Sequence, residues 1–87
     1  MLSLAQLSPG HRARILQVPP EKKRLLALGL RPGTVVEILL KAPLGDPLEV
    51  RAGETYLLLR RAEARGILVE ALIAADPHEL PPVPPTR

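Results

Sequence analysis

The sequence predicts a small, mostly β domain: a five-stranded barrel with one short helix after the first strand. Several short segments alternate apolar and polar residues, which is typical of strands with one buried face. Proline and glycine residues that favour turns separate these segments at short intervals. Five short strands around a thin aliphatic interior suit a small closed barrel.

The composition sets the size and the chemistry of this domain. A chain of 87 residues is long enough for one domain, which we place at residues 1–75. Residues 76–87 form a proline-rich tail, which we expect to be extended or disordered. The 46% of hydrophobic residues indicates a globular chain, and Tyr56 is the only aromatic residue, so the core must be aliphatic. The chain has no cysteine, which excludes disulfides and thiolate metal sites.

Charge and hydropathy narrow the classes of partner. The 12 basic and 9 acidic residues are interspersed, and stacking aromatics are lacking, so a nucleic-acid-binding barrel is only a third hypothesis. No apolar window is long enough to span a membrane, and the first residues do not resemble a signal peptide. We therefore expect a cytoplasmic protein.

The first half of the chain predicts a strand, a helix and a second strand. In residues 11–18, Ala13 and Ile15 point inward. Pro20 should open the helix, with Glu21 in its first turn, and Gly29 should cap its end in a left-handed conformation. The apolar stripe of this helix consists of Leu25, Leu26 and Leu28. Leu30 should anchor the chain where it leaves the helix.

Three further strands follow. Pro32 and Gly33 form a turn into a strand at residues 34–41. Its inward residues should be Val36, Ile38 and Leu40, and its outward residues Glu37 and Lys41. Residues 47–52, with Leu48 and Val50 inward, and residues 54–60 read as a hairpin that turns at Gly53. After a helical turn at "RAEAR", the last strand at 67–73 should turn Ile67, Val69, Ala71 and Ile73 to one face.

The chain carries no recognisable catalytic pattern. Phosphate-binding glycine motifs are absent, and His11 and His78 have no fixed nucleophilic partner in sequence. The carboxylates show no metal-loop spacing, and "DPHE" at 76–79 is at most a weak chelator. We therefore predict a protein that is not an enzyme, with no cofactor, no catalytic residue and no tight metal site.

Leucine is more abundant than a thin barrel can bury. Some of five leucines should therefore remain outside the core: Leu39, Leu44, Leu58, Leu68 and Leu72. They are either covered by the helix or part of a surface that binds another protein. Small size, no catalytic pattern and spare apolar surface together favour a binding module.

The run "RLLALGLRPGTVVEILLKAPLGDPLEV" resembles the FeoA family, the ferrous iron transport protein A domain. The elements that match are Arg24–Leu25, Leu28-Gly29-Leu30, Pro32–Gly33, Ala42 to Pro47, the opening Leu4, Leu7 and Gly10, and the run from Leu59 to Ala64 before "ILVE". The match covers about residues 2–73. It implies an SH3-like barrel and a non-enzymatic accessory that docks on and regulates the GTPase-containing membrane permease for ferrous iron, from the cytoplasmic side of the membrane.

Two sets of residues follow as predictions. The partner-binding surface should contain Leu44, Gly45, Asp46, Tyr56 and Leu58, whereas Leu28, Gly29, Leu30, Pro32, Gly33, Pro43 and Pro47 should shape the backbone. The alternative is a free-standing metal-sensing or metal-delivering domain that uses surface carboxylates and His11, related to the C-terminal module of iron-dependent repressors. Oligomeric state is left open.

Overall fold

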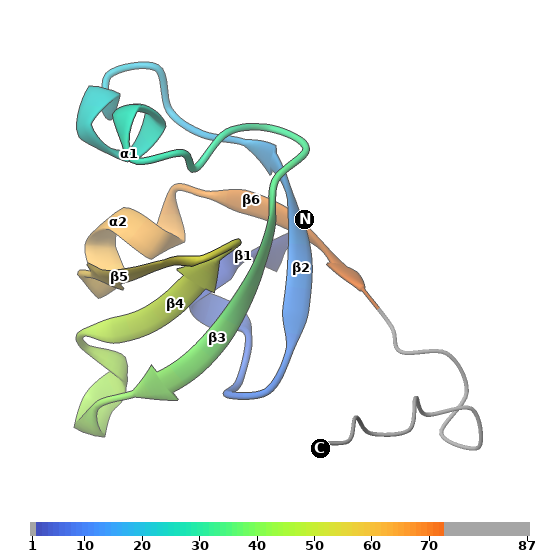
Figure 1. Cartoon of the computed structure of the whole chain (residues 1–87). Helices are drawn as coiled ribbons and strands as arrows, with labels where there is room; N and C mark the ends of the chain where they lie inside the picture. The colour runs from blue at the N-terminus through green and yellow to red at the C-terminus, as the bar shows by residue number, and fades with distance from the viewer. Residues whose placement is uncertain (1, 73–87) are drawn as a thin grey trace.

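The computed structural model describes residues 2–72, which form a curved six-stranded antiparallel sheet with short helical segments (Figure 1). In chain order the elements are β1 (Leu2–Ser3), η1 (Leu4–Gln6), β2 (Arg12–Gln17), α1 (Lys23–Ala27), β3 (Val35–Lys41), η2 (Pro43–Gly45), β4 (Leu48–Ala52), β5 (Thr55–Leu59), α2 (Arg61–Arg65) and β6 (Leu68–Leu72). The strands lie in the order β1-β6-β2-β3-β4-β5. The predicted proline-rich tail lies outside the described residues.

The mostly β class is confirmed, but the five-stranded closed barrel needs correction. The sheet has six strands, because the two residues of β1 pair with Leu68 and Val69 of β6. β1 and β5 are the two edges of the sheet, and no pairing between them closes a barrel within residues 2–72. The short helix α2 separates β5 from β6 along the chain, so these two strands do not form a hairpin.

The core is aliphatic, as the composition requires. Fifteen hydrophobic residues are buried, and no polar or charged residue is buried among those described. The inward faces of the strands supply most of them, including Ala13, Ile15, Val36, Ile38, Leu48, Val50, Leu59 and Val69. Leu4 and Leu7 complete the core from η1 and the residue after it, a contribution that strand alternation could not reveal.

The helix α1 begins later than predicted. The backbone N–H of Lys22 donates to the Pro19 carbonyl at 2.9 Å, so Pro20 and Glu21 form a turn that precedes the helix. Its end is as expected: Gly29 has a φ of 100° and donates to Leu26, and Leu30 donates to Leu25. These two bonds define a Schellman motif, whose hydrophobic pair is here the buried Leu25 and Leu30. Leu28, which the prediction placed in the apolar stripe, is 41% exposed, because the left-handed Gly29 reverses the chain and brings the buried Leu30 back to the helix end.

A β-bulge shifts the outer half of β3. Ile38 pairs with Val50, but the next residue of β4, Glu49, pairs with Leu40 rather than with Leu39. The extra residue moves Leu40 to the outer face, where 57% of it is exposed, although alternation predicted it inward. Lys41, predicted outward, instead pairs with buried Leu48 and is half-buried.

The remaining elements follow the sequence closely. Gly53 and Glu54 form a two-residue loop between Ala52 and Thr55, and Gly53 has the positive φ of 65° that such a turn needs. Ile67 and Val69 are buried as predicted, whereas Ala71 is exposed. Ile73 lies outside the described residues.

Candidate functional site

The outer face of the sheet carries an apolar row across three strands. Leu40 of β3, Glu49 of β4 and Leu58 of β5 are cross-strand partners, so their side chains share one face. That face is opposite the core, because neighbouring Val50 and Leu59 are fully buried. Leu40 and Leu58 are 57% and 64% exposed. Leu40 and Leu58 are therefore exposed to solvent on either side of the Glu49 carboxylate.

Two further exposed apolar side chains are Tyr56, which continues this row on β5, and Leu44, in the segment η2 at the end of β3. Tyr56 lies two residues before Leu58 on the same face of β5 and is 60% exposed. η2 follows β3, and Leu44 within it is 90% exposed. We call the four side chains Leu40, Leu44, Tyr56 and Leu58 the outer leucine surface.

Leu44 is unfavourable for folding in two respects. Its backbone has a φ of 68° and a ψ of 11°, the left-handed conformation that side chains other than glycine, asparagine and aspartate rarely adopt. Its side chain is 90% exposed and therefore buries almost no apolar surface that would offset this strain. Residues held in such conformations tend to cluster at functional sites, so this leucine points to a role outside folding.

Contacts from α2 hold the backbone of η2 in place. The Arg61 guanidinium donates to the Leu44 carbonyl at 3.2 Å, and the Arg61 backbone N–H donates to the Asp46 carboxylate, also at 3.2 Å. Arg60 adds an exposed ion pair with Asp46 at 3.7 Å. Gly45 continues the left-handed turn with a φ of 77°. The loop thus presents Leu44 from a fixed base.

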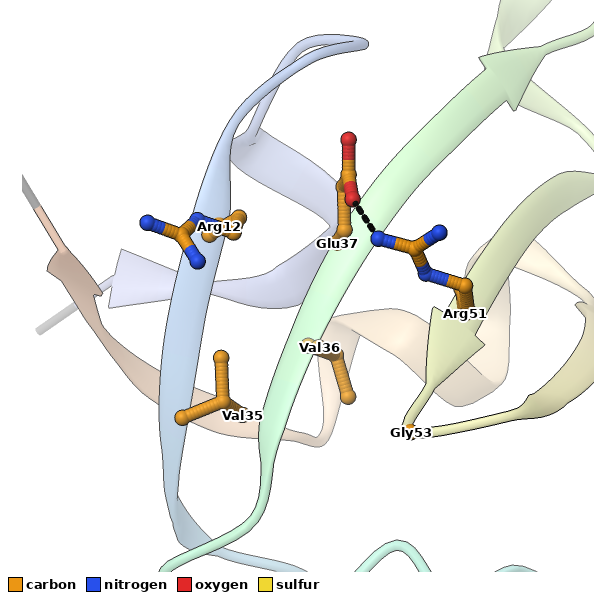
Figure 2. Close-up of a pocket in the computed structure, with 6 residues that line it drawn as sticks. All are labelled: Arg12, Val35, Val36, Glu37, Arg51 and Gly53. Atoms are coloured by element: carbon orange, nitrogen blue, oxygen red, sulfur yellow. Dashed lines mark hydrogen bonds and ion pairs between the residues drawn. The ribbon is translucent and has the colours of Figure 1, made fainter. Parts of the chain in front are cut away.

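A polar row runs beside the apolar one. Arg12, Glu37, Arg51 and Tyr56 are successive cross-strand partners on β2, β3, β4 and β5. Arg51 donates to Glu37 at 2.6 Å. Figure 2 shows this pair at a shallow pocket that Val35, Val36 and Gly53 also line, with the Arg12 guanidinium turned away from the pair. Since Glu37 neutralises Arg51, Arg12 is the one guanidinium of this pocket that forms no ion pair within residues 2–72.

The described residues offer little for catalysis or metal binding. His11 Nδ1 accepts a hydrogen bond from the backbone N–H of Ser8 at 3.1 Å. This imidazole nitrogen therefore stabilises a turn and is not positioned as a base for the Ser8 hydroxyl. Residues 2–72 contain no group of three or more His, Asp or Glu side chains that could hold a metal ion. His78 lies outside the described residues, as does the "DPHE" segment.

The predicted site residues fall into two places. Leu44, Gly45 and Asp46 lie in or next to η2, and Tyr56 and Leu58 lie on β5. Because Leu48 pairs with Leu59, the start of β4 brings η2 close to the end of β5. Sequence reasoning missed Leu40, since nothing in the alternation of residues 34–41 signals the bulge.

The residues predicted to shape the backbone lie in turns and caps. Leu28, Gly29 and Leu30 end α1, and Pro32 and Gly33 form the turn in which Thr34 donates to Arg31 at 3.0 Å. Pro43 begins η2, and Pro47 precedes β4.

These observations define a class: a small antiparallel β domain whose exposed apolar face suits binding rather than catalysis. The FeoA domain model matches residues 2–71, and the chain belongs to this family. It is similar to the solution structure of the FeoA protein from Chlorobium tepidum, with 40% identity and a TM-score of 0.77, covering 88% of this chain and 76% of that one. The family is a non-enzymatic accessory of ferrous iron transport.

A second relative supports the SH3-like description. The crystal structure of Stenotrophomonas maltophilia FeoA complexed with zinc, described as a procaryotic SH3 domain protein, is 30% identical. It matches with a TM-score of 0.72 over 80% of this chain and 91% of that one. A manganese-dependent transcriptional repressor matches with a TM-score of 0.72 at 16% identity, over 82% of this chain and 41% of that one, which shows a shared fold alone.

No helix within residues 2–72 could cross a membrane.

Proposed function

We propose that this chain docks on the GTPase-containing membrane permease for ferrous iron, at its cytoplasmic GTPase domain, and regulates transport. The contact surface comprises the predicted Leu44, Gly45, Asp46, Tyr56 and Leu58, to which the bulge adds Leu40. The chain would then act at the cytoplasmic face of the membrane through its partner.

The outer leucine surface is the observation that carries this proposal. Four large apolar side chains are more than half exposed although fifteen hydrophobic residues fill the core, and three of the four, Leu40, Tyr56 and Leu58, share the outer face of β3–β5. A contiguous exposed apolar patch is typical of a protein-binding surface, and aromatic anchors such as Tyr56 often contribute most of the affinity. The neighbouring Arg12, Glu37, Glu49 and Arg51 supply the polar rim that such interfaces have.

The test is the affinity of the chain for the isolated GTPase domain, with and without nucleotide, while GTP turnover is followed. We expect saturable binding that Leu58→Asp weakens by about tenfold or more, since a buried carboxylate at an interface centre costs over 1.4 kcal/mol. Leu16→Asp is the matched control. Leu16 is an exposed leucine (42%) on β2, at the end of the sheet away from η2.

Equal loss of affinity in Leu58→Asp and Leu16→Asp would reject the assignment of this surface. Absence of saturable binding to the GTPase domain would reject that domain as the partner. The alternative function, metal sensing or delivery through surface carboxylates and His11, gains no support from the geometry of residues 2–72.

A further inference from the structure

Strand β5 leaves one of its backbone edges unpaired within residues 2–72. It is the last strand of the sheet, and β4 is its only neighbour in the ladder. The other edge of the sheet is the two-residue β1, which offers far less backbone to a partner. The free edge of β5 therefore concerns five consecutive residues, Thr55–Leu59.

The hairpin decides which groups of β5 point outward. Ala52 and Thr55 flank the two-residue loop and are therefore a hydrogen-bonded pair. Hydrogen-bonded pairs then recur at every second residue, so Leu57 and Leu59 also bond to β4. Between them, Tyr56 and Leu58 direct their N–H and C=O groups away from β4. No other backbone hydrogen bond in residues 2–72 uses these groups.

The sequence of this edge lacks the residues that usually block pairing. Natural edge strands carry lysine, proline or a bulge that blocks a neighbouring chain. The β5 sequence, Thr-Tyr-Leu-Leu-Leu, has no charge and no proline, and its register with β4 is regular. An unpaired, regular and apolar edge is a template for strand addition.

The geometry points to a second copy of this chain as the occupant, with the two β5 strands antiparallel and Leu57 on the two-fold axis. In this register the numbers of any two paired residues, one from each copy, add up to 114. Tyr56 therefore lies opposite Leu58 of the second copy and exchanges two hydrogen bonds with it. Both members of this pair are the outward-pointing residues of the free edge.

Charge complementarity selects this register. At the ends of the same alignment Glu54 lies opposite Arg60 of the second copy, an opposite-charge pair that occurs twice by symmetry. Glu54 forms no ion pair within residues 2–72, and Arg60 has only its exposed contact with Asp46 at 3.7 Å. Alignments shifted by two residues lose both the full overlap of Thr55–Leu59 and this pairing of charges.

The chain's own C-terminal segment is a poor alternative occupant. Five of residues 73–87 are proline, which has no N–H to donate to a ladder. Edge pairing also leaves the side chains of Tyr56 and Leu58 on the outer face, where the two copies would form one larger apolar surface. The dimer is independent of the proposed permease contact and is tested without it.

Hydrogen exchange of the full chain at increasing protein concentration tests this pairing at individual residues. The amides of Tyr56 and Leu58 should become protected between about 20 µM and 1 mM, a range suited to a short and small interface. The amide of Leu57, which bonds to β4 in either state, serves as the control. Protection that does not change with concentration would overturn the proposal, because the occupant would then lie within the chain or be missing.

Variants distinguish a loss of the dimer interface from a loss of the fold. Leu58→Pro removes an N–H that β4 does not use, so a folded monomer should remain while the dimer seen by sedimentation disappears. Glu54→Arg and Arg60→Glu should each weaken the dimer by about fivefold, and the double variant should restore it. Dimerisation that survives Leu58→Pro in a folded chain, or a double variant no better than either single one, would overturn the register.

Discussion

The Asp46 carboxylate accepts a hydrogen bond at 3.2 Å from the backbone amide of Arg61, the first residue of α2. The amides in the first turn of a helix have no partner within the helix, and a side-chain acceptor usually comes from the residue just before it. Here that residue is Arg60, whose side chain has no acceptor. A residue fifteen positions away caps the helix instead, and so fixes η2 to α2.

Replacement of this cap should cost stability. Asp46→Ala removes the acceptor and the negative charge near the helix N-terminus, so we expect the free energy of unfolding to fall by about 1 kcal/mol. Asp46→Asn keeps an acceptor and should lose less. Arg60→Ala is the control for the exposed ion pair and should change stability by less than about 0.5 kcal/mol. Denaturant titration of the three variants measures how much each lowers the free energy of unfolding. Equal losses of stability in all three would contradict this prediction.

Gly29 should be intolerant of side chains for a conformational reason. An added Cβ would meet no atom within 4 Å, so any loss must come from the φ of 100°. We expect Gly29→Ala to lower the free energy of unfolding by about 1 kcal/mol and Gly29→Val by more, because β-branching worsens the strain. Gly29→Asn should lose least, since asparagine tolerates positive φ. Thermal melting would contradict this if the three variants melted together at the wild-type temperature.

The bulge in β3 predicts different tolerance at neighbouring positions. Leu40→Lys should change the free energy of unfolding by less than about 0.5 kcal/mol, because Leu40 faces solvent. Ile38→Val removes one methylene from a fully buried site and should cost about 1 kcal/mol. A large loss for Leu40→Lys would show that the regular alternation continues to the end of the strand.

Local chemistry explains which parts of the fold the sequence could predict. Pro32, Gly33 and Gly53 each restrict the backbone enough to place a turn, and the inward residues of β2 and β4 follow from strict alternation. The start of α1 could not be read in this way, because Pro20 suits both a turn and the first residue of a helix. The bulge after Ile38 depends on pairing with β4, a contact that residues 34–41 do not encode alone.

The candidate surface was predictable to a similar extent. Surplus leucine identified Leu44 and Leu58 as residues that a thin core could leave exposed, and both are exposed. Leu39, Leu68 and Leu72 belonged to the same group but are half-buried, since exposure depends on how neighbouring strands and helices cover each residue. The free edge of β5 required the strand order, which no local pattern gives.

Leu44 allows stability and binding to be separated in one variant. Asparagine tolerates the left-handed φ of 68° better than leucine, and the side chain it replaces is 90% exposed. Leu44→Asn should therefore raise the free energy of unfolding by about 0.5–1 kcal/mol. The same change removes an apolar contact and should weaken binding to the permease GTPase domain by several fold.

Leu58→Asn is the matched comparison for this variant. It should also weaken binding, but it should lower stability by a few tenths of a kcal/mol to about 1 kcal/mol, because asparagine is unfavourable within a strand. Leu16→Asn, on β2, should leave binding unchanged. A chain that becomes more stable while its affinity falls would show that Leu44 is kept for contact rather than for folding. Unchanged affinity in Leu44→Asn would remove η2 from the binding surface and leave only the residues of β3 and β5.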